Sequence, residues 1–154
     1  MSTRTGTTTM TELEIQSRVI AAVKKGHGVA EKISHKYIKG VCDLLIKLVD
    51  HPALLAEVKI HPRLVDATKP ISLEVTTLQR KFLYRFDAAG MQTCVISFLH
   101  GPVKNYQIRE YWIGVFPAHQ ESASTDEHTF IQQGSFDARV LLAIESYLMT
   151  EARG

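Results

Sequence analysis

The sequence predicts an α+β fold in which an N-terminal helical hairpin packs on an antiparallel sheet of three to four strands, followed by a C-terminal helix. Three observations lead to this prediction. A long stretch with helical periodicity comes first, consecutive runs typical of strands follow it, and a second amphipathic segment ends the chain. The 154 residues suit one domain, which we expect to span residues 11–154 after a disordered lead-in at 1–10.

The first half of the chain predicts the helical hairpin. Residues 11–15 alternate polar and apolar side chains, which suits a short strand or a first helical turn. Residues 17–25 predict a short helix, which the glycines on either side of His27 end. Residues 29–50 then predict a long helix, because apolar residues recur three and four positions apart. These residues are Val29, Ile33, Tyr37, Val41, Leu44, Leu45 and Leu48.

The middle of the chain predicts the sheet. Residues 71–78 form the first strand candidate. The runs KFLYRF (81–86) and TCVISFLH (93–100) flank a short connector with a glycine, which is typical of a β-hairpin. Residues 107–116 alternate as a further strand, and a polar loop then leads to Ser135, which suits the N-cap of the last helix.

Composition sets the class of protein. Hydrophobic residues make up 45% and charged residues 22%, as in ordinary globular domains, and the net charge of +2 permits nucleic-acid contact without arguing for it. No apolar run approaches the about 20 residues needed to cross a bilayer. Cys42 and Cys94 lie among apolar neighbours, so we expect two buried thiols rather than a disulfide. We therefore expect a cytoplasmic protein with no membrane contact.

Motifs for cofactors and metals are absent from the sequence. It has no phosphate-binding loop, no dinucleotide fingerprint and no paired CxxC motif. The seven histidines show no spacing of four residues and have no acidic cluster beside them. We therefore expect neither a metal site nor a cofactor.

Basic and polar side chains gather around the predicted hairpin. If residues 81–86 form a strand, Lys81 and Arg85 share one face, which Lys104 and Tyr106 approach from the neighbouring strand. Such cations can stabilise the charge that develops on a phosphate, and a histidine or tyrosine can move a proton. Ordinary solvent-facing charges on the wet side of a sheet are the alternative, which the residue pattern alone favours.

The order of elements and the segment QRKFLYRFDAAGMQTCVISFLHGPVKNY resemble the RelE/ParE toxin superfamily, including its HigB-like branch. The resemblance covers residues 11–106, and residues 107–154 are an extension relative to that family. It implies a toxin-type inhibitor of translation that acts as a ribosome-dependent, metal-independent endoribonuclease on RNA, with an antitoxin-like partner. The catalytic residues that it implies are Lys81, Arg85, Lys104, Tyr106 and His100.

Two other functions stay open at this point. A non-enzymatic inhibitor or adaptor would present Arg109, Tyr111 and Trp112 to a protein partner, because these residue types are common at interface hot spots. Ordinary sheet packing also explains that cluster. A small-ligand-binding protein would instead need an apolar cavity between the long helix and the aromatic face of the sheet. The sequence indicates no oligomeric state.

Overall fold

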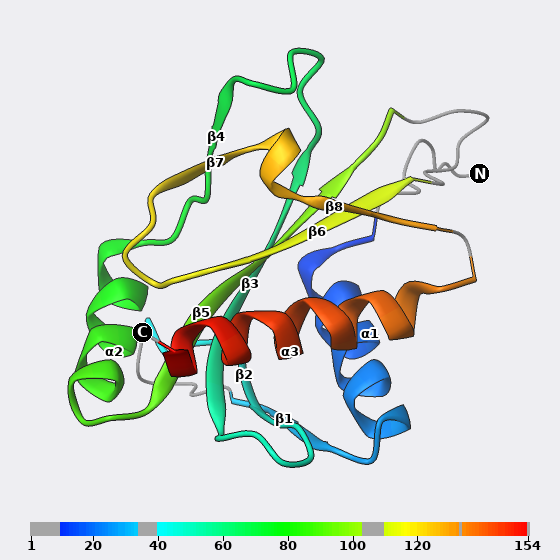
Figure 1. The fold of residues 1–154 in the computed structure, drawn as a ribbon. Coiled ribbons are helices and arrows are strands. Elements are labelled where there is room, and N and C mark those ends of the chain that lie inside the picture. Colours follow the sequence, from blue (N-terminus) through cyan, green and yellow to red (C-terminus); the bar gives the residue numbers. More distant parts are fainter. Residues whose placement is uncertain (1–9, 34–39, 103–109, 133, 154) are drawn as a thin grey trace, which may run out of the picture.

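The computed structural model describes residues 10–33, 40–102, 110–132 and 134–153. Within these ranges the chain forms one mixed sheet of six strands, a separate two-stranded sheet and three α-helices (Figure 1). The expected lead-in at 1–10 lies outside the described ranges except for Met10. Because the main sheet is mixed and has six strands, the predicted α+β fold, a helical hairpin on an antiparallel sheet, is wrong. The architecture is α/β.

Helices begin, interrupt and end the series of strands along the described chain. The helices are α1 (Glu12–Lys25), α2 (Thr77–Ala88) and α3 (Phe136–Arg153), with a short 3₁₀ helix, η1, at Thr125–Glu127. The strands are β1 (Val29–Lys32), β2 (Leu44–Lys47), β3 (Leu54–Pro62), β4 (Pro70–Ser72), β5 (Gln92–His100), β6 (Tyr111–Phe116), β7 (Ser122–Ser124) and β8 (Thr129–Ile131). The order in the main sheet is β1-β2-β3-β5-β6-β8, and β4 pairs with β7 alone.

The parallel pair of β3 and β5 forms the centre of the sheet. It runs from Leu54 opposite Gln92 to Pro62 opposite His100, whereas the other pairs in the main sheet are antiparallel. Both strands are buried along most of their length, as expected for strands covered on two sides. The crossover between them contains β4 and α2.

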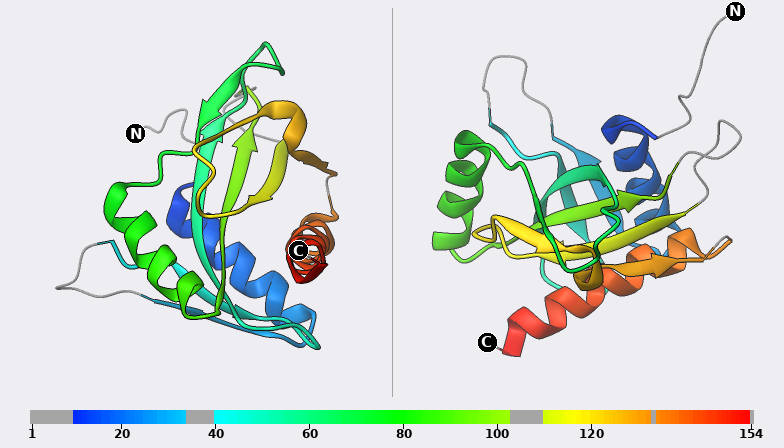
Figure 2. Two further views of the ribbon diagram at one scale, coloured as in Figure 1. Left: turned by 60° about the vertical axis from the view of Figure 1, so that its left-hand side comes forward. Right: turned by 90° about the horizontal axis from the view of Figure 1, so that it is seen from above.

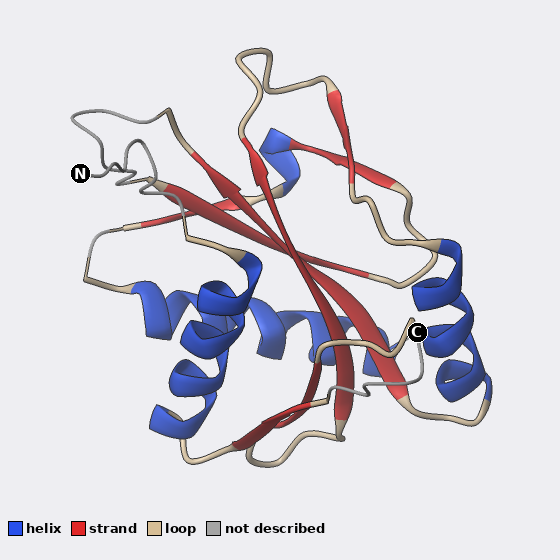
Figure 3. Ribbon diagram, turned by 180° about the vertical axis from the view of Figure 1, so that it is seen from behind, coloured by secondary structure: helices blue, strands red, loops and turns tan. Residues whose placement is uncertain are grey.

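Two different layers cover the sheet. Alternate residues of β3 and β5, such as Val58 and Ile96, pack with α1 and α3 in the main core. The opposite face packs against α2 through Leu55 and Leu83, and against the β4–β7 pair through Val95. Figure 2 shows α2 and α3 on opposite sides of the sheet, and Figure 3 shows β4 and β7 apart from the main sheet.

Helix α1 begins at a capping box, in which Thr11 and Glu14 bond each other's backbone N–H groups. The chain then turns closely onto β2, since a Cβ at Gly28 would lie 2.6 Å from the carbonyl oxygen of Lys47. Residues 29–32 and 44–47 form the strands β1 and β2, so the predicted long helix is wrong. Residues 34–39, with Tyr37 of the apolar pattern, lie outside the described residues.

The predicted β-hairpin is also wrong, because its first run is helix α2. Thr76 and Gln79 form a capping box that starts this helix, and Phe82 contacts Phe86 with ring centroids 4.9 Å apart and ring planes tilted by 42°. The second run is a strand, β5, but it pairs in parallel with β3. The resemblance to the RelE/ParE superfamily depended on this hairpin and is therefore wrong.

Some local predictions agree with the structure. Residues 111–116 form a strand, and a helix runs from Phe136 to Arg153. Cys42 and Cys94 are buried free thiols, which confirms that prediction. In the described part of the chain, no helix is long and apolar enough to span a membrane.

The attachment of α2 to the sheet depends on one side chain. Leu83 is fully buried, whereas Leu78 on the same helix is 52% exposed. We expect Leu83→Ala to lower the free energy of unfolding by about 2–5 kcal/mol, through lost burial and a residual cavity. Leu78→Ala should change it by less than about 1 kcal/mol. Chemical denaturation measures both, and equal losses would contradict this packing.

Candidate active site

Three charged side chains meet on the face of the sheet that α2 covers. Glu57 lies in the middle of β3 and is only 1% exposed. Lys59 follows two positions later and therefore points to the same face. Asp43 directly precedes β2, and the pairing of Leu44 with Ala56 places it beside Glu57. Charges buried in a central strand need strong compensation from their surroundings.

Asp43 is fixed by the backbone around it. Its carboxylate Oδ2 accepts a hydrogen bond of 2.8 Å from the backbone N–H of Val58. Its own carbonyl oxygen accepts a further hydrogen bond of 2.8 Å from the N–H of Ile33. The carboxylate is thus held at the start of β2 by the strand that carries Glu57 and Lys59.

Glu57 is oriented by the first turn of α2. Its Oε2 accepts a hydrogen bond of 2.7 Å from Gln79 Nε2 and lies 3.6 Å from Lys59 Nζ. Gln79 is itself fixed, because its Oε1 accepts a 2.9 Å hydrogen bond from the N–H of Thr76. The other oxygen, Glu57 Oε1, is buried without a hydrogen-bond partner in the described part of the chain. One oxygen of Glu57 is therefore anchored, and the other is buried without a partner, which in a folded protein calls for an explanation.

The two carboxyl groups interact electrostatically. The pKa of Glu57 is raised to about 8, chiefly by burial and next by the negative charge of Asp43, while Lys59 opposes the rise. Burial likewise raises the pKa of Asp43 above its usual value. At neutral pH the pair therefore holds a proton, which relieves the repulsion between the two negative charges. A bound cation would relieve the same repulsion.

Cys42 adjoins this pair but is no nucleophile. Burial raises the pKa of its thiol to about 12, and the charges of Glu57 and Asp43 raise it further toward that value. The thiol stays protonated at neutral pH, and only the thiolate attacks or binds metal. Cys42 therefore packs beside the site without taking part in its chemistry.

The polar face continues along β3 to His61. Its Nδ1 lies 3.2 Å from Glu74 Oε2, and its buried Nε2 has no hydrogen-bond partner within the described ranges. Glu74 has a positive φ of 56°, a conformation that side chains other than glycine rarely adopt. Such strain often marks functional sites. Glu57, Lys59 and His61 thus form one polar row along the strand.

A complete metal cage of protein side chains is not present. In the described ranges, no group of three or more His, Cys, Asp and Glu side chains could hold a metal ion. Two carboxylates suffice for Mg²⁺ when water and substrate phosphate oxygens complete its coordination. The arrangement of Asp43 and Glu57 fits this second kind of site.

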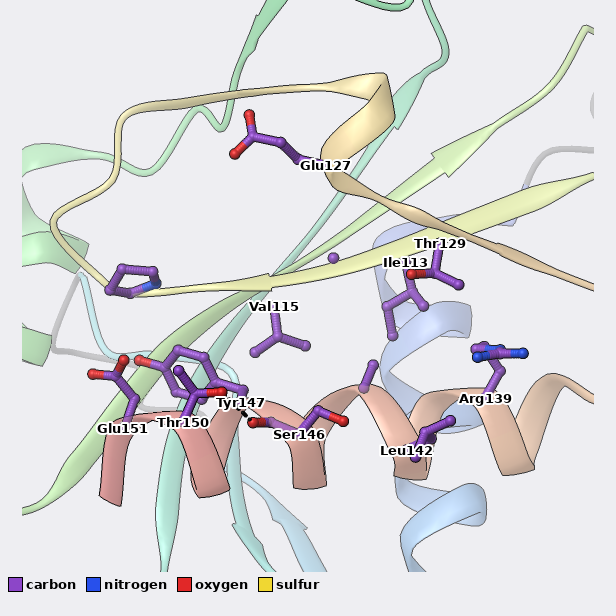
Figure 4. Close-up of a pocket in the computed structure, with 13 residues that line it drawn as sticks. Ile113, Val115, Glu127, Thr129, Arg139, Leu142, Ser146, Tyr147, Thr150 and Glu151 are labelled. Atoms are coloured by element: carbon purple, nitrogen blue, oxygen red, sulfur yellow. Dashed lines mark hydrogen bonds between the residues drawn. The ribbon is translucent and has the colours of Figure 1, made fainter. Parts of the chain in front are cut away.

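A separate groove of about 430 Å³ lies between β6 and α3 (Figure 4). Ile113 and Val115 line it on the sheet side, on the face opposite to Glu57. The hydroxyl of Thr150 in this groove donates to the carbonyl oxygen of Ser146 at 2.9 Å. The cavity expected for a small-ligand-binding protein differs from this one, because the long helix and aromatic strand that should line it do not form.

The residues that the sequence pointed to are scattered. Lys81 and Arg85 are exposed on helix α2 rather than on a strand, and His100 ends β5, where its Nδ1 lies 2.9 Å from the carbonyl oxygen of Gly101. Tyr111 and Trp112 begin β6. The remaining candidates, Lys104, Tyr106 and Arg109, lie outside the described residues. The structure does not bring Lys81, Arg85 and His100 to the carboxylate pair, and their catalytic role stays a prediction.

The sequence contained a signal for Glu57 and Lys59 that the sequence analysis missed. They stand two positions apart inside the apolar run LLAEVKI, which forms most of strand β3. Charges embedded in an apolar strand at this spacing lie on one face together. The part played by Asp43 and Gln79 depends on strand pairing and on the crossover, which no local pattern reveals.

The buried carboxyl makes stability depend on pH. The folded-state pKa of Glu57, about 8, exceeds its ordinary value of 4.5, so its contribution to stability is full below pH 4.5 and lost as pH rises to 8. In EDTA, Glu57→Gln should therefore gain stability relative to wild type over this window, on the order of 2–4 kcal/mol. Thermal unfolding at several pH values measures the trend. Glu121→Gln, at an exposed position, is the control, and a difference independent of pH would contradict the assignment.

Comparison with known proteins identifies no family. No family model matches the chain, and no curated protein does so. Among solved structures, the chain is similar to Hjc, a Holliday junction resolvase from the archaeal hyperthermophile Archaeoglobus fulgidus. The TM-score is 0.49 and the identity 14%, over 82% of this chain and 98% of that chain.

The functional predictions drawn from the family resemblance are corrected with it. The mixed sheet with its parallel central pair is not the antiparallel sheet that the toxin resemblance required. The translation toxin, its ribosome or RNA target and its antitoxin-like partner are therefore wrong.

Proposed function

We propose that this chain is a divalent-metal-dependent phosphodiesterase that hydrolyses nucleic acid, with Asp43 and Glu57 holding the cation and Lys59 contacting the scissile phosphate. One observation carries the proposal. The buried carboxyl group of Glu57 lies beside the half-buried Asp43 and beside Lys59, and one of its oxygens has no partner among the described residues. A divalent cation would replace the proton that Glu57 holds at neutral pH and would use that oxygen.

The residues suit Mg²⁺ or Mn²⁺. Both prefer oxygen ligands, and Mg²⁺ sites that act on phosphates commonly use one or two carboxylates together with substrate oxygens. Asp43 is already anchored by the Val58 N–H, and Glu57 by Gln79, so little side-chain freedom is lost on binding. The pair is therefore organised before the ligand arrives.

The reaction is hydrolysis of a phosphodiester. A bound cation would supply charge stabilisation and a water of lowered pKa. The water oxygen forms a bond to phosphorus while the bond to the leaving oxygen breaks, and the products are an alcohol and a phosphate monoester. Lys59 donates hydrogen bonds to the phosphate oxygens as negative charge develops on them. Gln79 acts as a positioning residue, because it touches Glu57 rather than the substrate.

Cleavage tests the assignment directly. In Mg²⁺ or Mn²⁺ we expect Asp43→Asn, Glu57→Gln and Lys59→Met each to lower the cleavage rate by at least about 100-fold. Substrates are single-stranded DNA, duplex DNA, RNA and a four-way DNA junction, the last because the similar solved protein is named for it. Lys69→Met, at an exposed lysine, is the matched control and should cleave as wild type. Loss of cleavage in Lys81→Met, with Asp43→Asn active, would overturn the proposal.

Metal binding can be measured without any substrate. At a Mn²⁺ concentration of 100 times its Kd, the ion should stabilise the folded protein by about 2.7 kcal/mol. Asp43→Asn and Glu57→Gln should lose this gain, whereas Glu121→Gln should keep it. Thermal unfolding and calorimetric titration with MnCl₂ measure the effect. A gain that persists in Asp43→Asn would place the ion elsewhere.

A further inference from the structure

A cluster of three side chains with planar end groups lies at the far end of the face that carries the carboxylate pair. It consists of Arg63, Trp112 and Phe130, and we call it the aromatic platform. The guanidinium of Arg63 lies 4.6 Å from the centre of the Trp112 ring, and the rings of Trp112 and Phe130 are 5.3 Å apart. Arg63 is exposed, and Phe130 is 40% exposed. Three planar groups from three segments thus meet at the surface.

The platform and the candidate active site share one face of the sheet. Along β3, Glu57, Lys59 and His61 point to that face, and Arg63 continues the alternation. The ladder also continues there, because Arg63 N–H donates to the carbonyl oxygen of His100 at 2.8 Å. Lys59 and Arg63 are four positions apart, which corresponds to about 13 Å along an extended strand.

Strand pairing places Trp112 and Phe130 on the same face. His61 lies opposite Leu99, and Leu99 lies opposite Trp112. Trp112 in turn lies opposite Phe130 on β8. Paired residues of neighbouring strands point to the same side of a sheet. The aromatic platform therefore belongs to the polar face of β3 and not to the face that α1 and α3 cover.

Exposed aromatic rings and guanidinium planes bind bases whose faces are not hidden in a duplex. We infer that the aromatic platform stacks on an unpaired base of the nucleic-acid substrate whose scissile phosphate Lys59 contacts. This inference rests on the proposed function. The substrate class is then a nucleic acid with single-stranded or unstacked nucleotides close to the scissile bond. Rigid strands hold the platform, which favours a fixed spacing between the stacked base and the cleaved bond.

An isolated cation–aromatic contact would be unremarkable, and the chain offers a matched example. On α2, the guanidinium of Arg85 lies 5.8 Å from the centre of the Phe82 ring, and that ring contacts Phe86 at a tilted angle. This second cluster has the same chemistry but lies on a helix and not in line with β3. It serves as the internal control for effects of charge and exposed rings.

Trp112 is the only tryptophan of the chain, so its fluorescence reports on the platform. We expect a twelve-residue oligothymidylate, added in EDTA so that no cleavage occurs, to quench this fluorescence. Arg63→Ala and Phe130→Ala should weaken its binding by about 5- to 100-fold, the range for one stacked base. Arg63→Lys keeps the charge but loses the plane and should also weaken binding. Arg85→Ala and Phe82→Ala should bind within twofold of wild type.

Anisotropy of the labelled oligomer measures all variants, and thermal unfolding confirms that each one folds. The inference is overturned if Arg63→Lys binds as wild type, if the α2 variants weaken binding equally, or if a twelve-base-pair duplex binds and quenches as strongly. Oligouridylate in place of oligothymidylate distinguishes an RNA from a DNA source of the base. If Asp43→Asn loses cleavage but the oligomer does not quench Trp112 fluorescence of the wild-type protein, the platform alone is refuted. Oligomer quenching with no metal-dependent cleavage would refute the proposed function and leave the base site standing.

Discussion

The buried carboxylate of Glu57 is the constraint around which the centre of the molecule is arranged. Taking a charge out of water is costly unless partners compensate for it, and apolar residues in the same place would pack without that cost. The chain surrounds this one side chain with Asp43, Lys59 and Gln79, yet leaves one of its oxygens without a partner among the described residues. Because the partners of Glu57 leave one of its buried oxygens without a hydrogen bond, this arrangement favours ligand binding over stability as the role of the site.

The topology explains how the site is assembled. A parallel pair such as β3 and β5 needs a crossover connection, and here the crossover contains α2. The capping box at Thr76 starts the helix, and its Gln79 completes the box and then reaches Glu57. Leu83, one turn later, packs on the sheet and holds the helix there. The same crossover therefore satisfies the sheet topology and orients the carboxyl group of Glu57.

The sequence predicted elements well where one periodicity prevailed, and poorly where two short elements imitated another period. Helix α3 and strand β6 have long, clear patterns, whereas β1 and β2 together imitated a helix over residues 29–50. The aromatic run 81–86 has strand propensity, but the capping box at Thr76 and Gln79 overrides it. Glu57 and Lys59 could have been found from their spacing in an apolar run. Asp43 could not, because only the β2–β3 register brings it to them.

Register also links the candidate site to the core. Alternate residues of β3 serve opposite faces, with Ala56 and Val58 packed against α1 and α3 and Glu57 and Lys59 turned toward α2. A slip of one residue against β5 would bury both charges in the apolar core and expose the core residues. The apolar pattern and the polar row therefore select the same register independently. Because Arg63 extends that row, the geometry that protects the core also fixes the distance between the carboxylate pair and the aromatic platform.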